Sequence, residues 1–322
     1  MRVGSILKNR VTSPLKGLFN DISHKYVRLG FARFFASLFN GTKFSNYFYR
    51  KKHDIILNEL KKELGDVLDR FKSYTGDVSY NENAPIWISW LQGYDSAPPL
   101  VKKCIDNIKK STTHPVNLIT LENMSDYVQL PDYIVKKFKE GKIINAQFAD
   151  ILRMTLLSEY GGLWIDATIF IPNGIPESVF QGEFYTCKRK PVQSGYVSDY
   201  KWTTFLIGCQ KGCVIADTVK ELFFEYLKRR DYLVDYFLFD YFLYLTYENI
   251  PHAKELIDNL PYNNSKIEEL QGMMNMPFNE EEYKKLIEAE DTIFYKLSWR
   301  MPFDKCTSSG EQTFFDFFLN NA

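Results

Sequence analysis

A helix-length segment, two glycines and an apolar run that ends in an acid follow one another between residues 145 and 172, NAQFADILRMTLLSEYGGLWIDATIFIP. Within 146–160, apolar side chains recur at spacings of three and four residues, which predicts a helix with a buried face. Gly161 and Gly162 then end the helix, because glycine tolerates the left-handed conformation of a helix cap. Residues 163–165 are apolar and predict a buried strand, and the apolar pattern resumes at 169–171.

Asp166 follows the predicted strand directly. A carboxylate embedded in an apolar strand is costly to bury unless it is paired or binds a cation. In open α/β sheets, the carboxyl ends of the strands present the groups that bind ligands. Asp166 is therefore the first candidate for a functional residue.

Asp150 and Arg153 lie three positions apart and share one face of the predicted helix. One interpretation is an ion pair on a solvated surface. The other is a binding site, because a carboxylate accepts sugar or ribose hydroxyls and a guanidinium matches phosphate oxygens. The spacing alone leaves both interpretations open.

The segments before this stretch predict an α/β sheet. Helical spacing over 54–74 is followed by a polar linker at 75–83, and residues 84–90 form a short apolar and aromatic strand. Pro99 is well placed to open a helix, and residues 116–121 form a second short strand. Strand, helix and strand in this order indicate the start of a nucleotide-binding α/β sheet.

Composition excludes several classes of protein. With 322 residues, 45% of them apolar and 16% aromatic, the chain can bury a large core, so we exclude intrinsic disorder. The longest run without a charge has twelve residues, 83–94, whereas a membrane-spanning helix needs roughly twenty. Five scattered cysteines suit neither a disulfide framework nor a paired metal site, and no apolar run of signal-peptide length opens the chain. We therefore expect a cytoplasmic protein.

The balanced charge of the whole chain, 40 basic against 40 acidic residues, conceals a basic N-terminal segment. Residues 1–53 contain eleven Lys and Arg and one acid, Asp21, so that this segment carries +10 and the rest of the chain −10. Leucine and aromatic residues alternate with the basic ones. This mixture favours a helix at an anionic membrane surface, but it also suits an extension that packs its apolar side on the main domain. Nucleic acid is a weak third option, since no nucleic-acid-binding module is recognisable.

Two separate segments carry a resemblance to a known family. FADILRMTLLSEYGGLWIDAT, from Phe148, resembles the sugar-nucleotide-binding core of the capsular polysaccharide synthesis protein family. That family is similar to the retaining glycosyltransferases with a DXD motif, among them yeast mannosyltransferases and the glucosylating clostridial toxins. IWISWLQGYDSAPPLVKKCI at 86–105 resembles their first strand and base-binding loop. The resemblance covers residues 85–171 well and extends loosely over 235–244 and 294–300.

The resemblance implies a fold and a division of the chain. We expect residues 81–322 to form a GT-A-type nucleotide-sugar-binding domain, a Rossmann-like mixed sheet flanked by helices. Residues 1–80 would form a basic, aromatic-rich helical extension at the membrane surface.

The resemblance also implies roles for individual residues. Trp90 would lie at the nucleotide base, Asp150 would contact the nucleoside and Arg153 the diphosphate. Gln92 would also bind the nucleotide sugar. Asp166 matches the first Asp of the DXD motif, which meets the metal and the donor sugar or ribose.

Four further residues complete the predicted site. Thr168 stands where the motif has its second Asp, and a hydroxyl is a weaker ligand for Mg²⁺ or Mn²⁺ than a carboxylate. Ser298 would add a late metal ligand, and Lys296 would close over the diphosphate. Asp235 resembles the acid that related transferases offer to the hydroxyls of the donor sugar, so the predicted catalytic residues are Asp166 and Asp235.

The function implied is the transfer of a hexose, galactose or glucose by preference, from a UDP-sugar to a lipid-linked capsular repeat unit with retention of configuration. A divalent cation, Mn²⁺ or Mg²⁺, would assist the departure of the diphosphate. The enzyme would sit at the inner face of the cell membrane through residues 1–53, without binding nucleic acid. Two alternatives remain: a sugar-phosphate transferase of capsule assembly, and a non-catalytic scaffold that binds nucleotide sugars.

Overall fold

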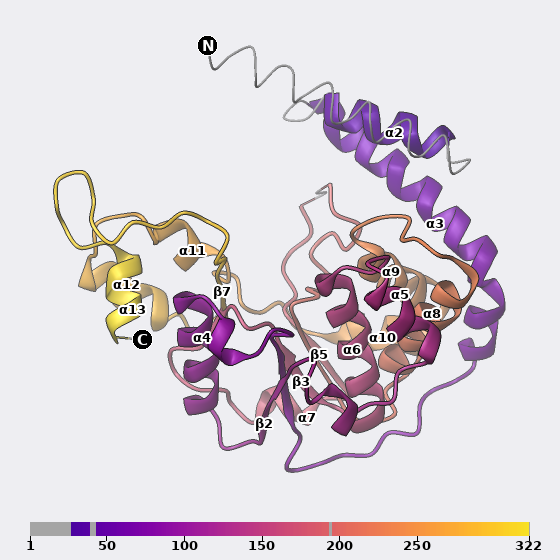
Figure 1. The fold of residues 1–322 in the computed structure, drawn as a ribbon, viewed down its shortest axis with the longest axis horizontal. Coiled ribbons are helices and arrows are strands. Elements are labelled where there is room, and N and C mark those ends of the chain that lie inside the picture. The colour runs from indigo at the N-terminus through magenta and orange to yellow at the C-terminus, as the bar shows by residue number, and fades with distance from the viewer. Residues whose placement is uncertain (1–26, 39–42, 193–194, 322) are drawn as a thin grey trace.

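The structure is a computed structural model that describes residues 27–38, 43–192 and 195–321. Its centre is a five-stranded mixed sheet in the order β2-β1-β3-β6-β5 (Figure 1). Strand β1 runs parallel to β2 and β3, whereas β6 is antiparallel to both β3 and β5. The bounds are β1 Ile86–Ser89, β2 Val116–Ile119, β3 Gly162–Ile165, β5 Phe184–Thr186 and β6 Leu206–Cys209.

Side chains on alternate positions of the central strands enter two separate cores. Trp87, Trp164 and Ile207 belong to the larger core, which is shared with the helices on one face of the sheet. Their neighbours along the strands, such as Ile88 and Ile165, belong to the core on the other face. Because both faces are covered, these strands consist almost entirely of apolar residues. The predicted mixed α/β sheet flanked by helices is thus confirmed.

Helices cover the two faces unequally. The larger core takes side chains from α3 (Lys43–Phe71), α5 (Asp132–Lys139), α6 (Asn145–Tyr160), α8 (Val214–Arg229), α9 (Leu238–Asn249) and α10 (Pro251–Asn259). On the opposite side lies α4 (Pro99–Lys110), which Pro99 opens as predicted. A third apolar cluster joins α4 to α11 (Glu269–Met273), α12 (Glu280–Ile287) and α13 (Phe314–Asn321), which form the left part of the molecule in Figure 1. The short helices α2 (Val27–Leu38) and α7 (Ser178–Gln181) complete the set described here.

The predicted passage from helix to strand is present at Gly161 and Gly162. Helix α6 ends at Tyr160, and the two glycines have φ of 69° and 98°. A Cβ atom on Gly162 would lie 2.0 Å from the carbonyl oxygen of Pro85. Both the positive φ and this close approach require glycine, so the turn holds α6 against the strand that follows it.

A two-stranded sheet brings the C-terminal region to the end of β3. Strand β4 (Ile169–Phe170) follows Asp166 and pairs antiparallel with β7 (Tyr295–Lys296). In this register Ile169 faces Lys296. The backbone N–H of Leu297 also donates to the carbonyl of Thr168 at 2.9 Å. Residues more than 120 positions apart are thereby held side by side.

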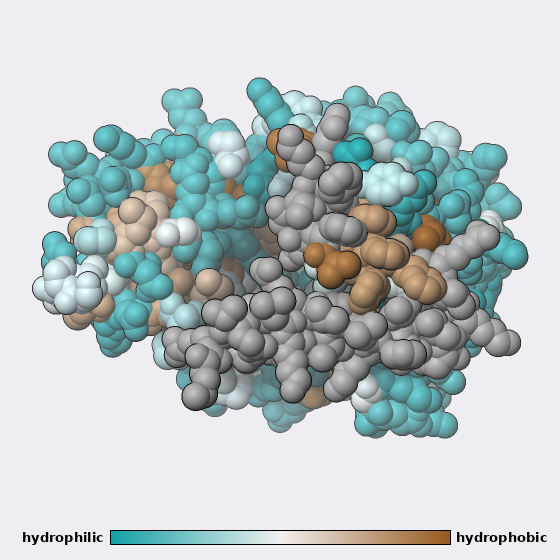
Figure 2. Space-filling model, turned by 90° about the horizontal axis from the view of Figure 1, so that it is seen from above, coloured by the Kyte–Doolittle hydropathy of each residue, from teal (hydrophilic) through white to brown (hydrophobic). Residues whose placement is uncertain are grey.

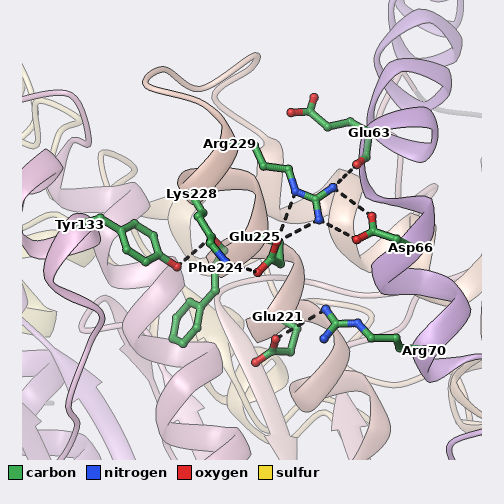
Figure 3. Close-up of polar contacts among 9 residues, drawn as sticks. All are labelled: Glu63, Asp66, Arg70, Tyr133, Glu221, Phe224, Glu225, Lys228 and Arg229. Atoms are coloured by element: carbon green, nitrogen blue, oxygen red, sulfur yellow. Dashed lines mark hydrogen bonds and ion pairs between the residues drawn. The ribbon is translucent and has the colours of Figure 1, made fainter.

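The N-terminal helices pack on the main body. Helix α3 starts eleven residues before the predicted 54–74 and ends three residues before its end. Its side chains Ile56, Leu60 and Leu64 are buried in the larger core. A polar contact with α8 adds to this packing: Arg229 of α8 pairs with Asp66 of α3 at 2.7 Å, and within α8 it also pairs with Glu225 at 2.9 Å (Figure 3).

The described part of the basic segment therefore fits the interpretation as an extension that packs on the main domain. Residues 1–26, which carry five of its basic charges, lie outside the described residues. The predicted linker 75–83 contacts the main body, since the backbone N–H of Ser79 donates to the carbonyl of Lys211 at 3.0 Å. Within the described ranges, no helix is both long and apolar enough to cross a membrane. All five cysteines are free thiols in the structure.

Candidate active site

A cavity of about 410 Å³ opens at the edge of the sheet where β1 and β3 end. These two strands are parallel, so their carboxyl ends meet at this edge, and the antiparallel β6 begins there. The cavity wall combines the ends of these strands with the first turns of α6 and α9 and the segment after β7. Its polar and aromatic side chains are Ser89, Trp90, Gln147, Asp150, Arg153, Trp164, Asp166, Thr168, Thr204, Tyr236, Phe237, Phe239, Asp240, Lys296, Ser298, Trp299 and Arg300.

Asp166 stands at the centre of the polar contacts in this cavity. Its Oδ1 accepts from Arg153 Nη2 at 3.2 Å and from Trp164 Nε1 at 3.0 Å, and its Oδ2 accepts from Lys296 Nζ at 2.9 Å. Burial by itself would raise the pKa of Asp166, but the charges of Lys296 and Arg153 and the donated hydrogen bonds outweigh it. The pKa of Asp166 therefore lies below its usual value, and this carboxylate is ionised at neutral pH.

Arg153 is a nearly buried cation held by two acids and two rings. Its side chain is 6% exposed, and its Nη1 lies 3.2 Å from Asp150 Oδ1. The guanidinium carbon sits 4.7 Å from the Trp164 ring centre and 5.1 Å from that of Phe239. Contacts of this kind fix the plane of a guanidinium. The interpretation of Asp150 and Arg153 as a solvated surface pair is therefore wrong, since both line the cavity.

Two acids of the cavity have raised pKa values. Burial raises the pKa of Asp150 to about 7, with Arg153 opposing the shift and the negative charges of Asp166 and Asp240 adding to it. Burial also raises the pKa of Asp240 to about 6, although Trp202 Nε1 donates to its Oδ1 at 3.0 Å. Perturbed carboxyl groups around a buried cation in a cavity are typical of functional sites.

Asp235 does not line this cavity. Its carboxylate is 8% exposed and pairs with Arg33 Nη2 at 3.1 Å and Lys52 Nζ at 3.4 Å. Asp235 thus ties the loop before α9 to α2 and α3. The carboxyl that does reach the cavity from this segment is that of Asp240, in the first turn of α9. Both acids stand in one apolar segment, and the resemblance pointed to Asp235, which the structure places outside the cavity.

Aromatic side chains line the mouth of the cavity. The ring centres of Trp90 and Trp299 lie 5.7 Å apart at an interplanar angle of 77°. Trp299 is 41% exposed, so its ring is open to a ligand. Gln92, predicted to bind the nucleotide sugar, is exposed and does not line the cavity, whereas Trp90 does. Trp299 and Arg300 were missed, although the resemblance extended loosely over 294–300.

The residues predicted to hold a divalent cation do not form a ligand set for one. Asp166 contributes the single carboxylate, and both of its oxygens already accept from cations. The Thr168 hydroxyl accepts from Lys296 Nζ at 2.8 Å. Ser298 lines the same cavity, and its backbone N–H donates to Gln271. No group of three His, Cys, Asp or Glu side chains suited to a metal occurs in the part of the chain that the structure describes.

The arrangement suits an anionic ligand that carries hydroxyl groups. Arg153 and Lys296 both donate to Asp166, and Arg153 also pairs with Asp150, so the centre of the cavity presents two fixed cations that can contact phosphate oxygens. Asp150 and Asp240 offer oxygens for hydroxyl groups, and Trp90 and Trp299 offer rings for an aromatic base or a sugar face.

Comparison with known proteins gives three findings. The sequence model of the family described as "Capsular polysaccharide synthesis protein" matches residues 37–318. A stretch of 145 residues is 30% identical to the O-glycosyltransferase braB of Annulohypoxylon truncatum. That match covers 38% of this chain and 34% of the relative, so the chain spans about a third of the relative's length. Among solved structures, the PaToxG glycosyltransferase is similar with a TM-score of 0.37 and 17% identity, over 77% of this chain and 96% of that one.

Proposed function

Since the chain belongs to the capsular polysaccharide synthesis protein family, we propose that it is a glycosyltransferase that takes a sugar from a nucleoside diphosphate sugar. The observation that carries the proposal is the ionised Asp166 at the end of β3, held between Arg153 and Lys296 in a cavity lined by aromatic rings. The activity named for the relative from Annulohypoxylon truncatum supports the same class of reaction.

In the proposed reaction the bond between the anomeric carbon and the β-phosphate oxygen breaks, and its electron pair leaves with the nucleoside diphosphate. Arg153 and Lys296 stabilise the negative charge that develops on that leaving group. The sugar becomes positively charged in the transition state, so the Asp166 carboxylate favours this charge from nearby. Asp150 and Asp240 accept hydrogen bonds from hydroxyl groups of the nucleoside and the sugar.

The size and lining of the cavity support a nucleotide sugar as the ligand. Its volume of about 410 Å³ lies within the range of roughly 300–1,000 Å³ usual for small-molecule sites. We place the base at Trp90 and Trp299 and the diphosphate at Arg153 and Lys296. UDP as the nucleotide and galactose or glucose as the sugar follow from the family resemblance, as do a lipid-linked acceptor and retention of configuration.

A membrane-surface position is a further part of the proposal. Phe31, Leu38 and Tyr47 are between 47% and 56% exposed on α2 and α3. Figure 2 shows hydrophobic side chains gathered over these two helices. Exposed Arg50 and Lys51 lie on the same hairpin, and apolar side chains beside basic ones favour an anionic lipid surface. Binding there would raise the local concentration of enzyme around a lipid-linked acceptor.

A panel of nucleotide sugars tests the activity. The purified full chain is incubated with each donor, and the nucleotide released is identified. We expect hydrolysis of at least one UDP-sugar, and a loss of about a hundredfold or more in Asp166→Ala, as for other electrostatic contacts of this kind. Glu122→Gln, at an exposed position away from the cavity, serves as the matched control and should retain full activity.

The same assay separates the alternatives. A glycosyltransferase releases the nucleoside diphosphate, whereas a sugar-phosphate transferase releases the monophosphate. UDP binding without turnover of any donor would support the scaffold interpretation. If UDP does not bind at all, the nucleotide-sugar site is wrong.

Sedimentation with lipid vesicles tests the membrane position. We expect the full chain to sediment with anionic vesicles and not with neutral ones. Phe31→Ser combined with Tyr47→Ser, or removal of residues 1–26, should reduce this binding. Unchanged sedimentation of both variants would contradict the membrane proposal.

A further inference from the structure

The ammonium of Lys296 lies between the two side chains that the DXD resemblance assigns to a metal. Its Nζ donates to Asp166 Oδ2 at 2.9 Å and to Thr168 Oγ1 at 2.8 Å. Pairing of β7 with β4 sets this position, because Ile169 and Lys296 face each other in the register. The contact is therefore built into the sheet and does not depend on a flexible surface loop.

A divalent cation would compete with this ammonium for the same oxygens. Mg²⁺ and Mn²⁺ sites are built mainly from carboxylate, carbonyl and water oxygens. Here one carboxylate and one hydroxyl are available, and Lys296 Nζ stands within hydrogen-bonding distance of both. Arg153 adds a second cation on the other oxygen of Asp166. A metal ion at this point would meet two fixed positive charges that already occupy both oxygens of Asp166.

Lys296 retains the means to contact a ligand in the cavity. An ammonium group has three N–H donors, and Asp166 and Thr168 account for two of them among the described residues. The side chain is 26% exposed and lines the cavity. The Phe205 ring centre lies 5.0 Å from Nζ, and the third donor can turn from this ring toward a phosphate oxygen in the cavity.

We propose that Lys296 supplies the positive charge that a divalent cation brings in the DXD enzymes, so that this chain binds and releases the nucleoside diphosphate without a metal. The inference rests on the proposed function and specifies how the leaving group is stabilised. The departing β-phosphate oxygen takes the electron pair of the broken bond and is met by the Lys296 ammonium. The acceptor oxygen forms the new bond to the anomeric carbon, and its proton passes to solvent. Thr168, a neutral residue at the position of the second Asp, keeps the ammonium from being neutralised by two carboxylates.

The first test uses the wild-type chain after treatment with EDTA. UDP binding is measured by calorimetry and donor hydrolysis by nucleotide release, each with EDTA and with added Mn²⁺. We expect both to be the same in the two conditions. Binding or hydrolysis that disappears in EDTA and returns with Mn²⁺ would overturn the inference while leaving the glycosyltransferase function intact. If neither UDP binding nor hydrolysis occurs in any condition, the proposed function fails and the inference fails with it.

The second test changes the ammonium itself. Lys296→Met should weaken UDP binding about tenfold or more, the effect of losing one charged hydrogen-bond donor. Lys285→Met, an exposed lysine on α12 away from the cavity, is the control and should bind UDP as the wild type does. Circular dichroism of both variants verifies that they are folded. A folded Lys296→Met variant with unchanged UDP affinity would contradict the inference.

The third test converts the site. In the double variant, Lys296→Ala removes the ammonium, and Thr168→Asp adds a carboxylate at the position of the second Asp of the DXD motif. We expect its UDP affinity to rise on addition of Mn²⁺, a response that the wild type lacks. A folded double variant with no response to Mn²⁺ would count against the inference, because the position would then not be one for a cation.

Discussion

Arg153 Nη2 and Asp166 Oδ1 lie 3.2 Å apart, on either side of the turn at Gly161 and Gly162. The pair joins the middle of α6 to the end of β3, thirteen residues further along the chain. Because the helix packs directly on the strand that follows it, the side chains at the two ends of this unit converge on one cavity. The geometry of the candidate site therefore depends on the turn as well as on the charges.

Replacing Gly162 with alanine should destabilise the protein strongly. The added Cβ would stand 2.0 Å from the Pro85 carbonyl oxygen, at a φ of 98° that non-glycine residues avoid. We expect the melting temperature to fall by several degrees or more, which thermal unfolding measures. Gly65→Ala is the matched control, since nothing lies within 4 Å of its added Cβ, six residues before α3 ends at Phe71. That substitution should stabilise the chain by roughly 0.5–1 kcal/mol, and a similar response of both variants would contradict this account of the turn.

Replacing Arg153 with lysine should impair donor turnover despite the retained charge. An ammonium cannot hold Asp150 and Asp166 together, and it loses the planar contacts with the two rings. We expect kcat/KM for donor hydrolysis to fall by about a hundredfold. Arg229→Lys, in the exposed ion pairs of Figure 3, should leave turnover unchanged and alter stability by less than about 1 kcal/mol. Equal turnover in the wild type and Arg153→Lys would remove Arg153 from the site.

The raised pKa of Asp150 makes its ionisation a cost to folding above neutral pH. Since its folded pKa of about 7 exceeds its ordinary value of 3.8, the native state holds the proton more tightly and stability falls as pH rises between these values. Asp150→Asn removes the titration, so its melting temperature should exceed that of the wild type above pH 7. One pKa unit corresponds to about 1.4 kcal/mol, so the gain is at most about 4 kcal/mol. The difference in melting temperature between the variant and the wild type should shrink as pH falls toward 4. A difference that does not depend on pH would contradict the raised pKa of Asp150.

Asp235→Asn should change the melting temperature at pH 7 in the opposite direction from Asp150→Asn. Burial alone would raise the pKa of Asp235, but the Lys52 charge, the Phe237 N–H and the Arg33 charge outweigh it and lower this pKa. A carboxylate with a lowered pKa stabilises the fold above its ordinary pKa, and that contribution is lost as pH falls through the folded value. The asparagine variant should therefore melt below the wild type at pH 7, and the two should converge in acid. A higher melting temperature for this variant at pH 7 would show that the ion pairs with α2 and α3 do not stabilise the fold.

Intrinsic fluorescence tests where the base binds. Trp299 is partly exposed beside Trp90, so UDP stacking on these rings should quench or shift the tryptophan emission. We expect Trp299→Phe to lose most of that change while it still binds UDP in calorimetry, because a phenyl ring keeps a stacking surface. An unchanged fluorescence response in this variant would place the base elsewhere.

Pattern alone was sufficient for the helix, turn and strand around Asp166. Helical spacing, two glycines and an apolar run are local features, and Asp150, Arg153 and Asp166 stand within twenty residues of one another. One turn of helix and one strand therefore carry all three to the cavity. Strand β1 follows the same logic, since parallel strands end at a common edge and bring Trp90 to the same cavity as Asp166.

The choice between Asp235 and Asp240 required the tertiary structure. The two acids are five residues apart in one apolar segment, and nothing local distinguishes them. Helix α9 begins at Leu238, so Asp235 precedes it and meets Arg33 and Lys52, whereas Asp240 lies in its first turn at the cavity.

The place of Lys296 was likewise decided by pairing of distant segments. The resemblance predicted that Lys296 lies at the diphosphate. Only the register of β7 on β4 sets its ammonium between Asp166 and Thr168. Helix, turn and strand follow from contacts between near neighbours, which the order of residues encodes directly. A contact across 130 residues depends on how two strands align, and that alignment is a property of the folded chain.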